Sequence, residues 1–420
     1  MIGGTVRSGG FVPQGALPSG GLAVVGRAGA AVLALLSLGA VLLLARDRVA
    51  AVSTSRQVQA PVQSGTQKAS LAAISAGSVL ALTRQASATP TSGAPTVREL
   101  VGQRFVVAMR GSSPSPALLA RVRRGEIGGV ILFGANVVGP AQLRRLTSTL
   151  QRAAREARRP PLLIAADQEG DRVRRVPWAG PTPSTVELGR LGTSRIRAEA
   201  FASGRALRLA GVNVNLAPVG DVPAPRSFMA LEQRTFASSP ASVAEATVAF
   251  ASGFAMAQVA ATVKHFPGIG RATRNTDRTA VDIAATRVDL IRSDFVPFRS
   301  AIAAGAPIVM ISNATYPALD AKPAPWSTRI QFLLRHEVGF SGVTISDALD
   351  CAAATRGRTL PSVAALAAQA GVDLLLLTGS EASSAAAFER VVGTAEQGRI
   401  SPVALEASFA RIMELKRVYG

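Results

Sequence analysis

Side chains that can do acid, base or hydrogen-bond chemistry follow several short apolar runs of this 420-residue chain. They are Asp167, Glu169 and Arg175 after one run, Asn215 and Asp221 in and after the next, Lys264 and His265 closing a third, and Asp347 after a later one. If these runs are parallel strands of a barrel, their carboxyl ends meet at one mouth and the polar groups crowd one pocket. Carboxylates beside Arg and Lys form charge-assisted hydrogen bonds that suit a ligand rich in hydroxyl groups. We therefore expect a sugar as the ligand.

Eight short apolar runs, separated by amphipathic helix-like segments, must position these groups. Their alternation over the last three quarters of the chain predicts an α/β fold, specifically a (β/α)8 TIM-type barrel. A doubly wound sheet is the alternative, but no run precedes a glycine-rich dinucleotide fingerprint, and polar groups end several different runs. The runs are 105–109, 129–133, 162–166, 212–217, 261–266, 307–312, 342–346 and 373–377.

The chain before the barrel has a different organisation. Residues 28–45 form an uninterrupted apolar run of near-minimal length for a transmembrane helix, and no clear small-x-small cleavage site follows it, so we expect an uncleaved signal anchor. Residues 46–95 are rich in Ser, Thr, Ala, Gln and Pro, which is typical of a flexible linker. We thus predict a cytoplasmic segment at 1–27, a membrane helix and linker, and a barrel at 96–420 outside the membrane, or secreted if the anchor is cleaved.

Composition limits the other possibilities. The single Cys351 excludes an intramolecular disulfide framework, so the core must be held by packing. The net charge of +20 comes mostly from scattered Arg residues, which fits an anionic cell envelope or an Arg-biased composition. No zinc-finger or RNA-binding aromatic motif accompanies the charge, so we expect no nucleic-acid partner. We also expect a monomer.

Five segments together resemble glycoside hydrolase family 3, and most closely its single-domain β-N-acetylhexosaminidase-like branch, which acts in peptidoglycan turnover. Each lies at the expected barrel strand, and the resemblance covers almost everything after about residue 97. The segments are PLLIAADQEGDRVRRV (161–176), GVNVNLAPVGDV (211–222), QRTFASSP (233–240), VKHFPGIG (263–270) and GVTISDALD (342–350).

The resemblance implies a retaining β-glycosidase that needs neither a metal nor an organic cofactor. Asp347 in ISDAL matches the family's nucleophile, which forms a covalent glycosyl-enzyme that water then hydrolyses. The implied substrates are terminal β-linked sugars of cell-wall glycans or muropeptide fragments of bacteria. The family's sugar-binding residues map onto Asp167, Arg175, Arg234, Lys264 and His265.

The general acid/base is where this chain departs from the family. Related enzymes carry Asp-Ser-His in the loop after the fifth strand, whereas here Asn275 stands at the place of that Asp and Asp277 at the place of that His. Three alternatives follow. In the first, which we favour, Asp277 is the acid/base, although Arg274 and Arg278 beside it stabilise its charged form. In the second, Glu169 moves into place and acts as the acid/base. In the third, the domain is a catalytically impaired wall-glycan-binding protein.

Two smaller departures also point to an altered pocket. Asp171 stands where the family usually has a second Gly after DQEG, and Asn313 stands where relatives often have His. The altered pocket therefore leaves open whether the substrate is the family's link between N-acetylglucosamine and anhydro-muramic acid.

Overall fold

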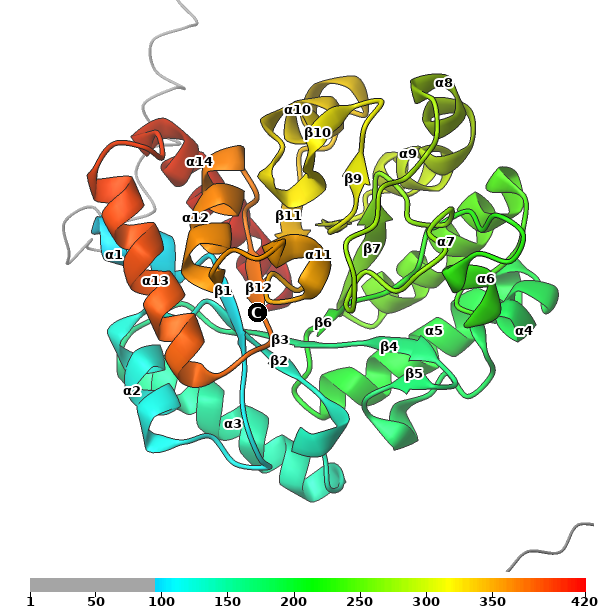
Figure 1. The fold of residues 1–420 in the computed structure, drawn as a ribbon. Coiled ribbons are helices and arrows are strands. Elements are labelled where there is room, and N and C mark those ends of the chain that lie inside the picture. Colours follow the sequence, from blue (N-terminus) through cyan, green and yellow to red (C-terminus); the bar gives the residue numbers. More distant parts are fainter. Residues whose placement is uncertain (1–94) are drawn as a thin grey trace, which may run out of the picture. The chain divides into compact units, whose positions relative to one another are not determined.

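The computed structural model describes residues 95–420, in which eight parallel strands close into a barrel inside a ring of helices (Figure 1). Neighbouring strands are hydrogen-bonded in the order β11-β8-β7-β6-β3-β2-β1-β12. The ring closes because the amide of Ser346 in β11 donates to the carbonyl of Leu374, just before β12, at 2.9 Å. The predicted α/β barrel is confirmed.

Each of the eight apolar runs contains one barrel strand. The strands are β1 (Phe105–Ala108), β2 (Gly129–Leu132), β3 (Leu163–Ala166), β6 (Val214–Asn215), β7 (Ala260–Phe266), β8 (Ile308–Ile311), β11 (Val343–Ser346) and β12 (Leu375–Leu377). Strand β6 covers only the middle of its predicted run, although backbone hydrogen bonds to both neighbouring strands continue on either side of it, for example from the N–H of Leu216 to the carbonyl of Ala166 at 2.9 Å. Two asparagine side chains add to this pairing. The Asn213 amide bridges the backbone of Leu162 and Ile164, and the Asn215 amide binds the backbone N–H and carbonyl of Gln168.

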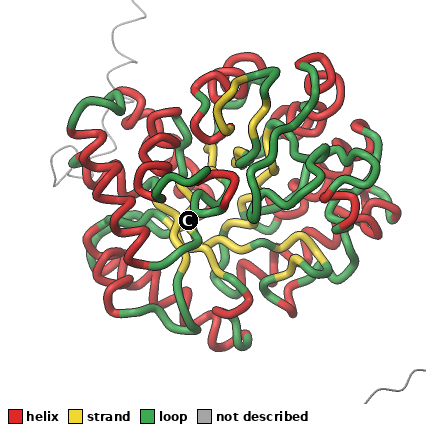
Figure 2. Tube along the Cα trace, viewed as in Figure 1, coloured by secondary structure: helices red, strands yellow, loops and turns green. Residues whose placement is uncertain are grey.

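Helices surround the barrel strands (Figure 2), and the longer ones bury an apolar face against them. In α3, for example, Leu143, Leu146 and Leu150 recur at helical spacing and are buried, and Pro140 occupies the first turn, where its missing N–H costs nothing. The helices are α1 (Val97–Gly102), α2 (Pro116–Arg124), α3 (Pro140–Glu156), α4 (Thr185–Arg190), α5 (Thr193–Leu209), α6 (Phe228–Leu231), α7 (Pro240–Met256), α8 (Arg287–Asp289), α9 (Val296–Ala303), α10 (Thr328–Phe332), α11 (Ala352–Thr355), α12 (Leu360–Ala370), α13 (Glu381–Glu396) and α14 (Pro402–Tyr419).

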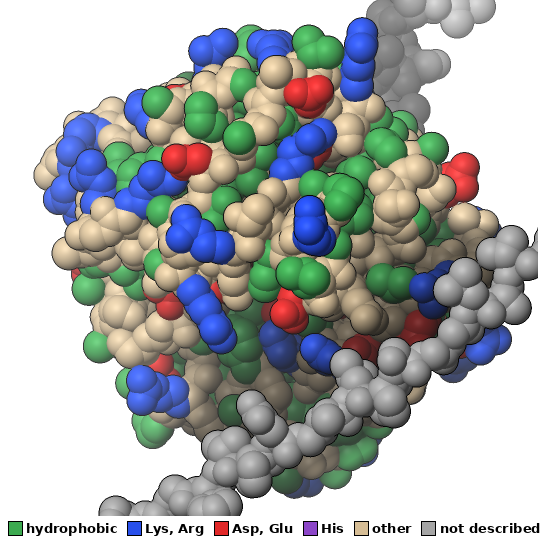
Figure 3. Space-filling model, turned by 45° about the vertical axis from the view of Figure 1, so that its right-hand side comes forward, with side chains coloured by type: hydrophobic (Ala, Val, Ile, Leu, Met, Phe, Trp, Pro, Cys, Tyr) green, Lys and Arg blue, Asp and Glu red, His purple; other side chains and the backbone are tan. Residues whose placement is uncertain are grey.

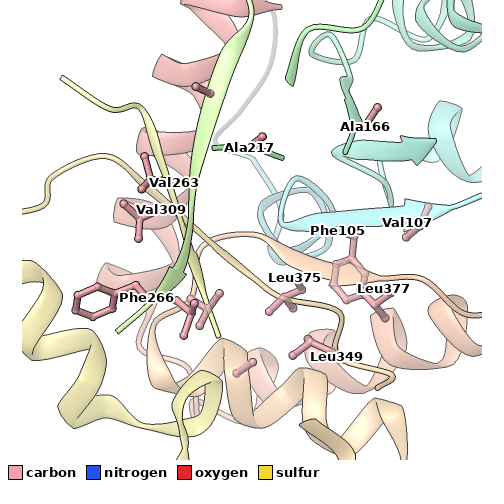
Figure 4. Close-up of a cluster of buried hydrophobic side chains, with 14 of the residues drawn as sticks. Phe105, Val107, Ala166, Ala217, Val263, Phe266, Val309, Leu349, Leu375 and Leu377 are labelled. Atoms are coloured by element: carbon pink, nitrogen blue, oxygen red, sulfur yellow. The ribbon is translucent and has the colours of Figure 1, made fainter. Parts of the chain in front are cut away.

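Side chains alternate between two cores along the barrel strands. Phe105 and Val107 of β1 point out and pack under the helices with Leu375 and Leu377 of β12 (Figure 4), whereas Val106, between the first two, points into the barrel. Both sets are buried, which explains why these runs read as continuously apolar in the sequence.

The C-terminal helix α14 closes the end of the barrel where the strands begin. Its Lys416 is buried and donates to the carbonyl of Gly128, just before β2, at 2.8 Å, and its Arg411 pairs with Asp373, just before β12, at 2.7 Å. The C-terminus accordingly lies at the centre of the ring of strands in Figure 1. Only the opposite end, where the strands finish, can hold an accessible pocket.

Two hairpins at that open end were not predicted from the sequence. One follows β3 and pairs β4 (Gln168–Gly170) with β5 (Val173–Arg174). The other follows β8 and pairs β9 (Thr315–Tyr316) with β10 (Asp320–Pro323). Their strands are too short to show a hydrophobic period of their own.

The predicted segments 1–27 and 28–45, and the linker up to residue 94, lie outside the described residues. From residue 95 onward, the structure contains no helix that is both long and apolar enough to cross a membrane.

Candidate active site

The predicted site residues converge on one cavity of about 230 Å³ at the open end of the barrel. They come from the β3 end and its hairpin, the loop before α7, the β7 end and its following loop, and the β11 end. The members are Asp167, Arg175, Arg234, Lys264, His265, Asp277 and Asp347, and Glu169 and Asn275 line the cavity with them.

Four of these residues form what we call the paired cluster: Asp167, Glu169, Arg234 and Lys264. The ammonium group of Lys264 lies 2.8 Å from the Asp167 carboxylate and 2.7 Å from that of Glu169. Arg234 binds both Glu169 oxygens, at 2.9 and 2.8 Å. Each charge in the cluster therefore has an opposite partner, and the geometry is rigid.

Burial and ion pairing shift the pKa values of Glu169 and Lys264 in opposite directions. Burial alone would raise the pKa of Glu169, whose side chain is only 2% exposed, but Arg234 and Lys264 outweigh it and hold that pKa well below its ordinary value. Burial alone would lower the pKa of Lys264, but the charges of Asp167 and Glu169 outweigh it, and the pKa is raised. Glu169 is thus held ionised and Lys264 protonated.

Arg175 adds unused hydrogen-bonding capacity beside the paired cluster. Its Nε lies 4.0 Å from Asp167, too far for a hydrogen bond, and is buried without an acceptor among residues 95–420. Its guanidinium lies 5.9 Å from the centre of the Phe133 ring. A ligand oxygen near Asp167 could accept from it.

His265 is oriented by Asp221, a fully buried residue to which the sequence pattern alone assigned no role. The Asp221 carboxylate lies 2.7 Å from Nδ1 of His265 and also accepts the backbone N–H groups of His265 and Ile269, at 3.3 and 2.8 Å. With Nδ1 engaged, Nε2 is the ring nitrogen left for the cavity. Asp221 ends the segment NVNLAPVGD, six residues past Asn215, and nothing in that segment predicts the contact, because its partner His265 is 44 positions away.

Asp347 and Asp277 form what we call the carboxylate pair. Asp347 follows β11, and its Oδ1 accepts the backbone N–H of Ala348 at 2.8 Å. Burial raises the pKa of Asp347 and the charge of Asp277 adds to this, while His265 and Lys264 oppose it. Within residues 95–420 neither carboxylate forms an ion pair at hydrogen-bond distance, so this part of the cavity carries uncompensated negative charge.

The loop that carries Asp277 is held against the segment after Asp347. The carbonyls of Thr276 and Asp277 accept the N–H groups of Ala353 and Ala352 of α11, at 3.2 and 3.1 Å. The Asn275 side chain accepts the N–H of Asp277 at 2.8 Å, so it shapes the turn. The Asp277 side chain is exposed.

Two arginines fix the same loop near its ends. Arg271 lies 3.1 Å from the buried Asp294, and Arg356, after α11, lies 2.8 Å from Asp282. Burial raises the pKa of Asp294 to about 6, with Arg271 opposing the shift. By contrast Arg274 and Arg278, the neighbours expected to influence Asp277, are exposed and make no ion pair with it in the described part of the chain.

The two other departures from the family pattern lie outside the cavity lining. Asp171 lies at the tip of the β4/β5 hairpin with φ 42°, a conformation that Asp tolerates better than most residues but that suits Gly best. Asn313 is buried, and its Nδ2 donates to the carbonyl of Ala348 at 2.8 Å and to Sγ of Cys351 at 3.0 Å. Asn313 therefore supports the segment that follows Asp347.

In residues 95–420, His, Cys, Asp and Glu side chains nowhere gather in a group of three that could hold a metal ion. Metal-free and cofactor-free chemistry remains a prediction.

The family model described as "Glycosyl hydrolase family 3 N terminal domain" matches residues 96–415. An "Uncharacterized secreted glycosyl hydrolase" of Arthroderma benhamiae is 34% identical over 330 residues, covering 75% of this chain and 92% of the relative. "Beta-hexosaminidase A" of Pseudoalteromonas piscicida is 32% identical over 328 residues, covering 72% of this chain and 55% of the relative.

Among solved structures, a glycoside hydrolase family 3 beta-N-acetylglucosaminidase from Paenibacillus sp. str. FPU-7 superposes with a TM-score of 0.74 at 31% identity. The match covers 78% of this chain and 63% of that one. The chain therefore spans less than two thirds of the Paenibacillus protein and of the Pseudoalteromonas relative.

Proposed function

Because this chain belongs to glycosyl hydrolase family 3 and is thus a glycoside hydrolase, we propose that it is a retaining, exo-acting β-glycosidase, most similar in action to β-N-acetylglucosaminidases. The observation that carries the proposal is the meeting of a rigid paired cluster and an unpaired carboxylate pair in one cavity. The first suits binding of hydroxyl groups, and the second suits glycosidic bond cleavage. Beta-hexosaminidase A and the Paenibacillus beta-N-acetylglucosaminidase support the choice of sugar.

In this proposal the paired cluster holds the terminal sugar. Asp167 accepts hydrogen bonds from ring hydroxyls, while Arg175, Arg234, Lys264 and His265 donate to them. The partners that fix these side chains before a ligand arrives reduce the entropy lost on binding. Arg175 Nε, which has no acceptor in the described part of the chain, gains one from the ligand.

Asp347 attacks the anomeric carbon and forms a covalent glycosyl-enzyme, which water hydrolyses in a second step. Asp277 protonates the leaving group in the first step and takes a proton from the attacking water in the second. Its placement at the cavity, opposite a carboxylate whose pKa it raises, supports this role. Glu169 is a poorer acid because Arg234 and Lys264 keep it ionised.

A catalytically impaired glycan-binding protein is the second candidate function. It is favoured by one observation, the exposure of Asp277, since an exposed carboxylate lacks the apolar surroundings that keep a catalytic acid protonated. Both candidates retain the paired cluster and differ only in turnover.

We further propose that the substrate is a cell-wall glycan or a muropeptide fragment, reached from outside the membrane. The apolar run at 28–45 and the linker at 46–95 support an exported, tethered or released monomer, and the related Arthroderma protein is named as secreted.

The test uses the full chain and an aryl β-N-acetylglucosaminide. We expect release of the aryl group, retention of anomeric configuration in the first product, and loss of activity in Asp347→Ala. A 2-fluoro or 5-fluoro glycosyl fluoride should label Asp347, as peptide mapping would show. A folded protein that turns over none of a broad panel of aryl glycosides, yet binds glycans, would replace the hydrolase by the second candidate.

A further inference from the structure

The outer helices of the barrel differ sharply in charge. On the face drawn in Figure 3, basic side chains outnumber acidic ones, and acidic side chains lie among them. The charged residues are distributed far less evenly among the individual helices. Helix α2 carries three arginines and no acidic residue, and α3 and α5 each carry four arginines and one glutamate.

Other outer helices show that this is not a uniform property of the chain. Helix α7 has 17 residues, as α3 and α5 do, yet its single charged residue is Glu245. Helix α12 has no charged residue, and α13 has three glutamates and one arginine. An arginine-rich coding composition would place arginines on all these helices alike. The concentration of charge on α2, α3 and α5 therefore requires another reason.

We call the outward side of these three helices the α2–α3–α5 surface. They follow one another around the barrel wall (Figures 1 and 2). Arg159, just after α3, donates to the carbonyl of Arg123 in α2 at 3.1 Å, and Thr147 in α3 donates to the carbonyl of Ala210, at the end of α5, at 2.9 Å. The surface is thus held rigidly along its length.

Most arginines of this surface are available to a ligand. Six of them are exposed and make no ion pair with any carboxylate in residues 95–420: Arg123, Arg144, Arg145, Arg155, Arg197 and Arg205. Unpaired, exposed guanidinium groups repel one another, which costs stability unless an anion is bound. The planar fork of each group matches a phosphate oxygen pair.

The curvature of the surface indicates what kind of anion fits. Because the helices wrap around the barrel wall, their arginines do not all lie in one plane, so a flat bilayer or a straight, stiff duplex reaches fewer of them than a chain that bends along the wall. A flexible chain can follow all three. In addition, the apolar side of α3 is buried, and Leu209 is the only large apolar side chain on the three helices that is mostly exposed, whereas helices that enter membrane interfaces expose an apolar face.

We propose that the α2–α3–α5 surface binds a flexible, linear phosphodiester polymer of the polyol phosphate type. The surface lies on the barrel wall and the cavity lies at its mouth, so polymer binding and sugar hydrolysis are separate activities of one domain. Binding would hold the domain on a polyanionic matrix while the cavity remains open.

The test is a pair of fourfold variants of the full chain with the same loss of charge. The surface variant is Arg144→Gln, Arg145→Gln, Arg155→Gln and Arg197→Gln. The control variant is Arg292→Gln, Arg329→Gln, Arg390→Gln and Arg399→Gln, four exposed arginines without ion pairs on other helices and loops. None of the eight lines the cavity.

Affinity for fluorescently labelled poly(glycerol phosphate) is measured by anisotropy over a range of salt concentrations. We expect the surface variant to bind at least tenfold more weakly than the wild type, with a salt dependence reduced by about two to three in slope, since each contact to a flexible chain contributes roughly 0.7. The control variant should lose less than threefold. Circular dichroism and thermal unfolding confirm that both variants are folded.

Equal losses in the two variants, or no binding by the wild type, would overturn the proposal. So would tighter binding of the wild type to phosphatidylglycerol vesicles than to the polymer, lost in the surface variant, because the surface would then serve a membrane. Displacement of the polymer by polyglutamate at equal charge concentration would also contradict a phosphate-specific surface. Since no outcome depends on turnover, failure here is distinguishable from failure of the proposed hydrolase activity.

Discussion

The paired cluster and the carboxylate pair occupy the same cavity but have opposite electrostatics. In the first, every charge lies against an opposite charge, and the chain has compensated the cost of burying Glu169 and Lys264. In the second, the charge of Asp277 adds to the burial of Asp347 and makes its ionised form more costly. The comparison teaches that the groups we propose for binding are fixed by opposite charges, whereas those we propose for reaction have no such partner, so that a substrate can supply what is missing.

The largest effect should come from removing the acid of the carboxylate pair. In Asp277→Asn, we expect kcat/KM to fall by about 10²- to 10⁴-fold for substrates with poor leaving groups and much less for a dinitrophenyl glycoside, which needs no protonation. The measurement is a series of aryl glycosides that differ in leaving-group pKa. Asp171→Asn, a hairpin carboxylate outside the cavity lining, is the matched control and should behave as wild type. A uniform loss across the series would exclude Asp277 as the acid.

Breaking the paired cluster should destabilise the fold. In Glu169→Gln, we expect the free energy of unfolding at pH 7 to fall by about 3 kcal/mol, because Arg234 and Lys264 lose a buried partner. The pKa of Glu169 is depressed in the folded state, so its stabilisation is present above the ordinary glutamate pKa and is lost as pH falls below it. The difference between variant and wild type should therefore shrink in acid. Urea unfolding measures it, and the exposed Glu232→Gln serves as control; a neutral result would refute a stabilising role for the cluster.

The same type of substitution in the carboxylate pair should change the free energy of unfolding in the opposite direction. The pKa of Asp347 is raised in the folded state, so its ionisation costs stability at neutral pH, and this cost disappears below the ordinary aspartate pKa. Asp347→Asn should therefore raise the free energy of unfolding by about 1 kcal/mol at pH 7, as is common when a functional site is neutralised, while abolishing turnover. The gain should vanish in acid. A destabilised Asp347→Asn would contradict the contrast between the two regions.

The smallest expected effect is a shift in the pH dependence of kcat/KM. Because the charge of Asp277 raises the pKa of Asp347, Asp277→Asn should move the acid limb of kcat/KM to lower pH when measured on a dinitrophenyl glycoside. The limb of the wild type should lie above the ordinary aspartate range. An unchanged limb would mean that the two carboxylates do not interact in the active protein.

Much of the fold could be predicted because the barrel strands are buried on both faces and read as apolar runs. Each of the eight runs overlaps one strand, yet β6 covers only two residues of its run, a length that the apolar pattern did not predict. The hairpins β4/β5 and β9/β10 were missed because segments of two to four residues have no detectable period.

What the sequence determined by itself was the set of chemical groups and the strands that end in them. The ordered motifs predicted that Asp167, Arg175, Arg234, Lys264 and His265 share one site, and they do line one cavity, while their part in sugar binding stays a prediction. The anchor at 28–45 and the monomeric state remain predictions.

The tertiary structure decided how those groups act on one another, because pKa shifts and orientation depend on distances between residues far apart in the chain. It placed Asp221 against His265, held Glu169 between Arg234 and Lys264, and left Asp277 without an ion pair to Arg274 or Arg278 in residues 95–420. Sequence neighbours suggested that arginines would control Asp277, but in the folded chain its influence falls on Asp347, 70 positions away in the sequence but in the same cavity.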